Sequence, residues 1–315
     1  MDEDQVTNMI EWFKKEFEDK DIGLVKISRG KKHKFLGMEF DFTDIGAVKI
    51  DMKSYVLDMI KSFPEKVTTK AATPAAVHLF QTREDAPKLS EEKASIYHTI
   101  TAKGLFLCKR ARADIQTTIA FLSTRVKEPD EDDWKKLKQL IQYLFGTIDL
   151  KLTLMSDKLN IIKWFVDASH HVHPDFRSHT GSTMTIGKGS PYSTSIKQKL
   201  NTKSSNESEL VTVDDLMPMI IWTNNFLKHQ GLKTRDTIIY QDNKSAILLE
   251  TNGRYSSSKR TRHIEARYFF VTDYKNQGAF KINYCPTDDM IADFFTKPLQ
   301  GNKFQNFRKM IMNLS

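Results

Sequence analysis

The most constraining feature of the sequence is the order of its strand-like and helix-like segments after residue 160. Short apolar segments alternate there with segments whose apolar residues recur at helical spacing. We expect strands at Ile161–Asp167, Gly181–Gly187, Tyr192–Gln198, Thr237–Gln241 and Ala279–Tyr284, and helices at Glu207–His229, Asn243–Glu250, Arg262–Asn276 and Asp289–Phe295. This order predicts an α/β fold in which helices flank a mixed five-stranded sheet.

The first 160 residues are patterned differently and predict a partial α+β unit. We expect helices at residues 4–20, Lys53–Ser62, Glu91–Leu107, Asp114–Thr124 and Trp134–Leu144, and strands at Gly23–Ser28, Lys34–Phe42 and Ala47–Asp51. Residues 64–90 are rich in Pro, Thr and Ala and predict a connecting loop.

Composition narrows the class of protein. The net charge of +8 favours a polyanionic partner. Two cysteines without CxxC spacing argue against a disulfide framework and a zinc site, and favour a reducing, intracellular compartment, cytoplasmic or nuclear. The sequence has no apolar run of membrane-spanning length and no signal-peptide core at its start, so we expect no membrane association.

Four acidic residues of the second half stand where strands end or helices begin. They are Asp167, Glu209, Asp242 and Asp293. Such positions converge at one edge of a sheet, where sites usually form. Carboxylate oxygens suit Mg²⁺ or Mn²⁺, and two such ions roughly 3.5–4 Å apart can activate a water and stabilise a leaving oxygen in phosphodiester hydrolysis. We therefore predict that the four acids are catalytic and bind two ions.

Several motifs resemble the ribonuclease H of Ty1/copia-type retrotransposon polyproteins. They are Val166-Asp-Ala-Ser, Arg177-Ser-His-Thr-Gly, Ser204-Ser-Asn-Glu-Ser-Glu-Leu, Asp242-Asn-Lys-Ser-Ala-Ile, Lys259-Arg-Thr-Arg-His-Ile and Ala292-Asp-Phe-Phe-Thr-Lys-Pro-Leu. The resemblance implies a ribonuclease H fold, the four-acid site and an RNA–DNA hybrid substrate whose RNA strand is cut. It also places the catalytic glutamate just before a Leu or Tyr, which selects Glu209 over Glu207.

The sequence argues against two other kinds of site. An integrase or transposase would need a glutamate about 35 residues after Asp242, but position 277 is Gln and no Glu follows Glu265. A zinc site at His170, His171, His173 and His179 lacks a cysteine and a tetrahedral spacing. We therefore interpret these histidines as part of a polar loop.

The first half resembles the end of a copia-type reverse transcriptase. The matching segments are Phe35-Leu-Gly-Met with its hairpin, Tyr97-His through Arg110-Ala-Arg-Ala-Asp-Ile, Phe121-Leu-Ser-Thr-Arg, and Trp134-Lys-Lys-Leu through Tyr143-Leu-Phe-Gly-Thr, with Ala113 in place of the usual Pro. The resemblance implies three parts: the end of the palm with a primer-grip-like hairpin (1–65), thumb-like and connection helices (66–160) and ribonuclease H (161–315).

The polymerase acids are not among these matching segments. No Tyr-x-Asp-Asp hairpin is present, and Val213-Asp-Asp falls in a predicted helix. We therefore expect a truncated reverse transcriptase that does not polymerise DNA by itself but retains ribonuclease H. The alternatives are a silent hybrid-binding remnant and a subunit that needs a separate fingers–palm chain. No small-molecule cofactor is implied.

Two basic clusters are predicted to contact the hybrid backbone. One lies in the thumb-like segment (Lys103, Lys109, Arg110 and Arg112), and the other in the second half (Lys259, Arg260, Arg262 and His263). On this basis we expect a fragment cut near Asp157 to fold and cleave, but to bind hybrid more weakly than the full chain.

Overall fold

The computed structural model describes residues 3–18, 23–157, 159–252 and 265–314, with the main chain only for 265–269. The first half contains helices α1 (Glu3–Phe17), α2 (Lys53–Lys61), α3 (Glu91–Cys108), α4 (Gln116–Arg125) and α5 (Glu131–Gly146), the short turn η1 (Ala113–Ile115), and strands β1 (Lys32–Phe35), β2 (Met38–Asp41), β3 (Ala47–Asp51) and β4 (Leu152–Ser156). Most of the predicted elements are present. Gly23–Ser28 forms no strand, and β4 was not predicted.

The second half contains the predicted alternation of strands and helices. Its elements are β5 (Ile161–Ser169), β6 (His179–Thr185), β7 (Gly187–Lys188), β8 (Tyr192–Lys197), α6 (Ser205–His229), β9 (Asp236–Gln241), α7 (Lys244–Asn252), α8 (Glu265–Asn276), β10 (Lys281–Tyr284), α9 (Asp293–Thr296) and α10 (Gly301–Met312). The predicted final helix is instead the short helix α9, followed by the longer α10.

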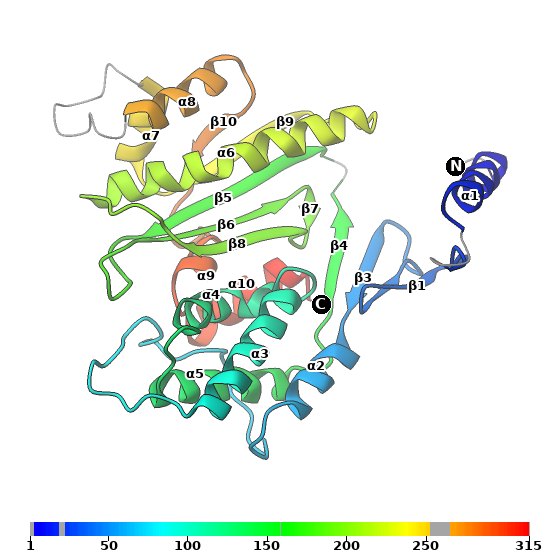
Figure 1. Cartoon of the computed structure of the whole chain (residues 1–315). Coiled ribbons are helices and arrows are strands. Elements are labelled where there is room, and N and C mark those ends of the chain that lie inside the picture. The colour runs from blue at the N-terminus through cyan, green and yellow to red at the C-terminus, as the bar shows by residue number, and fades with distance from the viewer. Residues whose placement is uncertain (1–2, 19–22, 158, 253–264, 315) are drawn as a thin grey trace.

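Two five-stranded sheets organise the chain. The larger has the order β10-β9-β5-β6-β8, in which β5 is parallel to β9 and antiparallel to β6. Helix α6 covers one face of this sheet, and α4, α9 and α10 lie on the other side (Figure 1). The second sheet, β1-β2-β3-β4-β7, joins the halves because β7 of the second half pairs with β4.

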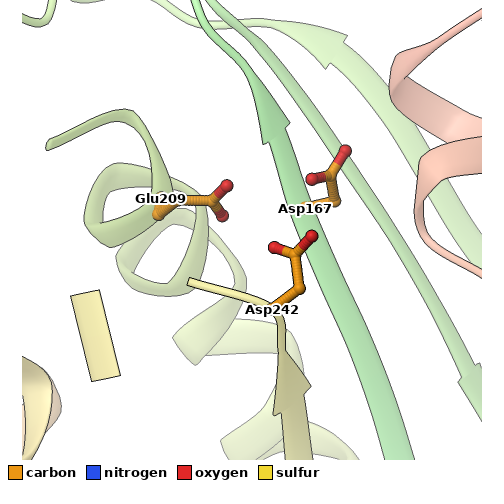
Figure 2. A group of neighbouring side chains, drawn as sticks. All are labelled: Asp167, Glu209 and Asp242. Atoms are coloured by element: carbon orange, nitrogen blue, oxygen red, sulfur yellow. The ribbon is translucent and has the colours of Figure 1, made fainter. Parts of the chain in front are cut away.

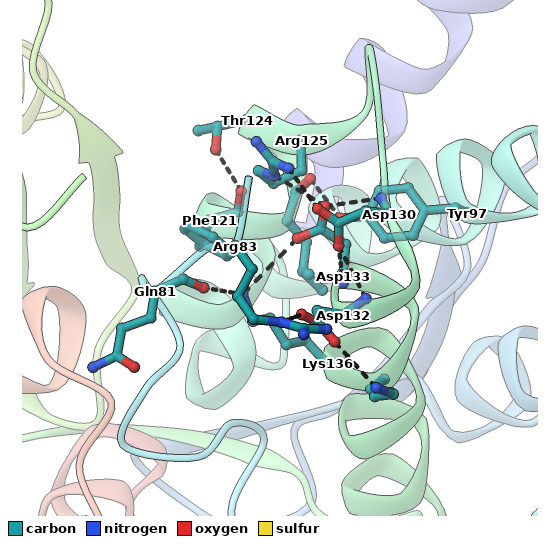
Figure 3. A network of polar contacts seen from close by, with 12 residues as sticks. Gln81, Arg83, Tyr97, Phe121, Thr124, Arg125, Asp130, Asp132, Asp133 and Lys136 are labelled. Atoms are coloured by element: carbon teal, nitrogen blue, oxygen red, sulfur yellow. Dashed lines mark hydrogen bonds and ion pairs between the residues drawn. The ribbon is translucent and has the colours of Figure 1, made fainter. Parts of the chain in front are cut away.

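The helices of the first half are tied together by ion pairs around the start of α5 (Figure 3). Asp130 caps this helix, and its carboxylate also pairs with Arg125 of α4 at 2.9 Å. Arg125 pairs with Asp133 at the same distance, and Arg83 from the preceding loop pairs with Asp132 at 2.6 Å. These contacts fix α4 and the 62–90 segment against α5, and α4 is one of the helices on the face of the larger sheet opposite α6.

The larger hydrophobic core combines residues from both halves. It contains Ile119 and Phe121 of α4 and Leu140 of α5 together with Phe304 and Ile311 of α10. A second, smaller core lies between α6 and the sheet. The predicted domain boundary at residue 160 stays a prediction. The larger hydrophobic core extends across this boundary. Cys108 and Cys285 are both buried and free.

Candidate active site

Three of the four predicted acids come together at one edge of the larger sheet. Asp167 lies near the end of β5, Glu209 in the second turn of α6, and Asp242 directly after β9 (Figure 2). One carboxylate oxygen from each lies within 4.8 Å of the others. Figure 2 shows the three side chains pointing toward one another. The parallel pairing of β5 and β9 places the ends of these two strands side by side, as expected at a sheet edge that forms sites.

Helix capping explains why Glu209, rather than Glu207, faces this cluster. Ser204 caps α6 by accepting a hydrogen bond from the Glu207 amide. The Glu207 carboxylate accepts from the Lys203 amide at 2.7 Å, so it closes the start of the helix. Two residues on, the helix has turned about 200°. The Glu209 side chain therefore points to the sheet edge.

Burial and mutual repulsion make the cluster costly without a cation. Burial, with nearby Asp293 and Asp242, raises the pKa of Asp167 to about 6, although Lys297 and Thr296 act in the opposite direction. Burial and the same kind of repulsion, here from Asp167 and Asp242, hold the pKa of Glu209 well above its usual range. Because burial and repulsion disfavour the charged forms of Asp167 and Glu209, the cluster is suited to a hard divalent cation, which would favour those forms.

The fourth acid, Asp293, lies beside the cluster and is held by lysines. Its carboxylate pairs with Lys297 and, at 2.8 Å, with Lys303. The Lys297 ammonium also lies 3.5 Å from Asp167, so it bridges two of the predicted catalytic acids. Thr296 donates to Asp167 as well. The sequence reasoning missed Lys297 and Thr296, although the motif that identified Asp293 contains both.

A glycine allows α9 to approach the sheet closely enough for these contacts. Gly181 on β6 is the register partner of Asp167. A Cβ atom there would lie 2.5 Å from Thr296 and 2.9 Å from the main chain of Phe295. The Gly of the Arg177-Ser-His-Thr-Gly motif therefore has a steric role in the site.

The predicted thumb-like basic cluster is only partly available to a ligand. Arg112 was assigned wrongly, because its guanidinium is 1% exposed and pairs with Asp114 at 2.8 Å. Lys109 donates to the Ser193 carbonyl of β8, and Arg110 stacks on Phe106. Lys103 pairs with Asp58 at 3.1 Å. Their role as phosphate contacts stays a prediction, and Lys259, Arg260, Arg262 and His263 lie outside the described residues.

The interpretation of the histidines as a polar loop is wrong for two of them. His173 and His179 are buried and joined by a 2.9 Å hydrogen bond, and His179 is also hydrogen-bonded to Ser195. Both rings pack against Phe80 from the first half. Among the described residues, the acidic cluster is the one group with metal-ligating geometry, and it contains no histidine.

Comparisons with known proteins cover most of the chain. The Pol polyprotein of transposon TNT 1-94 from Nicotiana tabacum is 26% identical over 315 residues, which is 93% of this chain and 23% of the polyprotein. That of transposon RE2 from Arabidopsis thaliana is 28% identical over 281 residues (89% and 19%). The Ty1-LR3 Gag-Pol polyprotein of Saccharomyces cerevisiae is 21% identical over 309 residues (94% and 17%). No family profile matches the chain.

Solved structures that are similar to part of this chain include ribonucleases H. LC11-RNase H1, solved in complex with an RNA/DNA hybrid, is 14% identical and overlaps 42% of this chain and 92% of its own, with a TM-score of 0.33. RNase H1 from Halobacterium salinarum NRC-1 is 11% identical and overlaps 46% and 98%, with a TM-score of 0.28.

The larger sheet is mixed and five-stranded, helices flank it and three acids converge at one edge, which is the arrangement that the sequence predicted for a ribonuclease H-like fold. These relatives, which align with most of the chain, are Ty1/copia-type retrotransposon polyproteins, which confirms the resemblance found in its motifs. The chain spans about a fifth of the length of these relatives. Among the described residues, no helix is long and apolar enough to cross a membrane.

Proposed function

We propose that this chain is a retrotransposon ribonuclease H that hydrolyses the RNA strand of RNA–DNA hybrids with two divalent ions, Mg²⁺ or Mn²⁺. The observation that carries the proposal is the convergence of Asp167, Glu209 and Asp242 to within 4.8 Å. Asp293 completes the proposed ligand set from α9. The intact set of acids favours a nuclease over a silent hybrid-binding remnant.

The chain's own residues would bind the ions and orient the nucleic acid. Asp167 and Asp242 would hold an ion between adjacent strand ends, with Glu209 approaching from α6 and Asp293 from α9. Bound ions supply charge neutralisation and an activated water for phosphodiester hydrolysis. Thr296 and Lys297 orient and neutralise Asp167 before an ion enters. Exposed basic residues would hold the duplex through its phosphates.

We attribute no polymerase chemistry to this chain. The acidic pair Asp214 and Asp215, which mimics a reverse-transcriptase motif, lies within helix α6 rather than in a β-hairpin. The first half is proposed to be the end of a reverse transcriptase, whose polymerase acids are not among the residues of this chain. Under this proposal, a separate chain with fingers and palm would supply the polymerase site.

A cleavage assay on the full chain tests the proposal and contains its own control. We expect Mg²⁺-dependent cutting of the RNA strand in a hybrid, and a loss of about 10²–10³-fold or more in Asp167→Asn and Glu209→Gln, the order lost when a group that stabilises transition-state charge is removed. Glu207→Gln should keep most of the activity, because glutamine retains the cap. No cutting by the wild-type chain, or equal activity in Asp167→Asn, would refute the proposal.

A further inference from the structure

Helix α7 buries a glutamate on the face that an apolar residue would normally occupy. Glu250 has 0% exposed surface and lies four residues after Ala246, which is also fully buried, so both sit on the inward face of the helix. Leu248, by contrast, is 57% exposed. Burying a carboxyl group while a leucine of the same helix stays exposed costs free energy of folding. Such departures from the usual pattern occur at functional sites.

Glu250 and its neighbour Gln241 contain three of the buried polar atoms that lack a hydrogen-bond partner among the described residues. These atoms are both carboxylate oxygens of Glu250 and Oε1 of Gln241. Gln241 is the last residue of β9, it is fully buried, and its side chain lies beside the Glu250 carboxyl group. Thr272 donates to the main-chain oxygen of Glu250 and leaves the carboxyl group unsatisfied.

The protonation state of Glu250 resolves this shortage. Burial raises the pKa of Glu250 to about 8, although the neighbouring Gln241 side chain acts in the opposite direction, so the neutral acid predominates near pH 7. A neutral carboxyl group has one O–H donor, whereas a carboxylate can only accept. The amide oxygen of Gln241 is an acceptor without a donor. One hydrogen bond from Glu250 to Gln241 would therefore give a partner to two of these three atoms.

Gln241 connects this pair to the acidic cluster. Its Nε2 atom lies 3.5 Å from Oε2 of Glu209 and donates toward it. Glu209 also accepts a hydrogen bond from the main chain of Ala168. If the Gln241 amide were reversed, its oxygen would face the Glu209 carboxylate, and the two would repel each other. The orientation of one amide therefore decides whether Glu209 is supported or pushed away.

We propose that Glu250 is a positioning residue for the acidic cluster: as a neutral acid it donates to Gln241 Oε1 and so holds Gln241 Nε2 toward Glu209. This inference rests on the proposed metal-binding role of Glu209. It assigns to α7 a task in the site, although no atom of Glu250 belongs to the carboxylate cluster. Partners in the second layer of a metal site usually change metal affinity about 10–100-fold when they are removed.

Titration of the full chain with Mn²⁺, by calorimetry in the absence of nucleic acid, tests the inference. Glu250→Leu removes the donor but keeps an apolar group of similar size, and we expect Mn²⁺ affinity to fall about 10-fold or more. Glu250→Gln keeps a neutral N–H donor, and its affinity should stay within about twofold of wild type. Rescue by the amide separates positioning from a need for charge.

Gln241→Leu supplies the second arm of the test and does not depend on the folding of Glu250→Leu. It should lose as much Mn²⁺ affinity as Glu250→Leu, and the double variant should lose no more than either, because the two residues act in series. Unchanged affinity in either leucine variant, equal losses in Glu250→Gln and Glu250→Leu, or additive losses in the double variant would each overturn the inference.

The wild-type titration keeps the two proposals apart. If the wild-type chain binds Mn²⁺ and Asp167→Asn does not, the metal site stands, and the leucine variants alone judge the role of Glu250. If the wild-type chain binds no Mn²⁺, the proposed metal site and the inference both fall. Cleavage activity enters neither decision.

Discussion

The two faces of the larger sheet are covered in different ways. On the α6 face, β5 presents Ile162, Trp164 and Val166 to apolar residues of α6 such as Leu216 and Ile220. All of these residues come from the second half of the chain. The middle of α6 therefore packs on an apolar part of the sheet, whereas its first turns meet polar side chains, since Gln198 Nε2 donates to the Ser208 carbonyl and to Thr212.

The opposite face of the sheet presents small, polar side chains. The helices that cover it come from both halves of the chain. Gln116 of α4 exchanges two hydrogen bonds with Ser193 of β8, at 3.0 and 2.5 Å. Thr117 of α4 donates to the Phe294 carbonyl at 2.7 Å, which connects α4 to α9. The first half thus supports the helix that carries Asp293, Thr296 and Lys297.

The difference indicates that the acidic cluster is built from two kinds of support. Glu209 lies on α6, whose core contacts come from the second half of the chain. Asp293 depends on the polar face, where the fit relies on hydrogen bonds and on segments distant in sequence. Perturbing the polar face should therefore affect the α9 side of the site first.

The largest expected effect is the loss of the first half. We predict that a fragment of residues 160–315 will not unfold cooperatively, because it lacks α4 and its share of the larger core. This replaces the expectation from sequence that such a fragment folds and cleaves. Urea denaturation followed by circular dichroism measures it, with the full chain as control. If the fragment unfolded cooperatively at the same urea midpoint as the full chain, the polar face of the sheet would be stable without the helices of the first half.

Acid should weaken the polar face next. Burial lowers the pKa of His173 to about 4, and burial with the neighbouring His173 lowers that of His179 to about 3. Folding therefore favours the neutral rings, and this stability is complete above pH 6.5 and is lost as the pH falls toward 4. At pH 5 we expect a loss on the order of 2 kcal/mol for each ring relative to pH 7.

The control for the acid effect is a histidine from the same segment. His171 is exposed, so His171→Gln should keep the wild-type pH dependence, whereas His173→Gln should flatten it. Chemical denaturation at pH 7 and pH 5 measures the difference. If the free energy of unfolding changed equally between pH 7 and pH 5 in the two variants, the buried histidine pair would not be the cause of the acid effect.

A smaller effect on stability, but a large one on the site, is expected from Gly181→Ala. The added methyl group meets α9 at 2.5 to 2.9 Å, and we expect a loss of about 1–3 kcal/mol from overpacking. Displacement of α9 should also reduce cleavage. Ser182→Ala is the matched control, since the buried Ser182 hydroxyl has no partner among the described residues and its removal should be nearly neutral. Equal behaviour of both variants would contradict the close approach.

The sequence by itself determined the elements that depend on local pattern. The strand β5, the capped helix α6 and the short connection after β9 place Asp167, Glu209 and Asp242, and each is visible in its own segment. Helix α10 was also readable, since Phe304, Phe307 and Ile311 recur at helical spacing, but it was not predicted. Local periodicity and capping act within a few residues, so a single segment carries the information.

Only the tertiary structure decided which side chains are exposed to a ligand and which residues contact the buried ones. Arg112 reads as a surface cation, yet Asp114 and the Thr147 carbonyl bind it in the core. Glu250 reads as a surface acid, yet it is buried beside Gln241. Strand β4 pairs with β3, about 100 residues earlier in the chain. Burial and long-range pairing depend on which segment covers which face, and that choice is made by the packing of the whole chain rather than by any one segment.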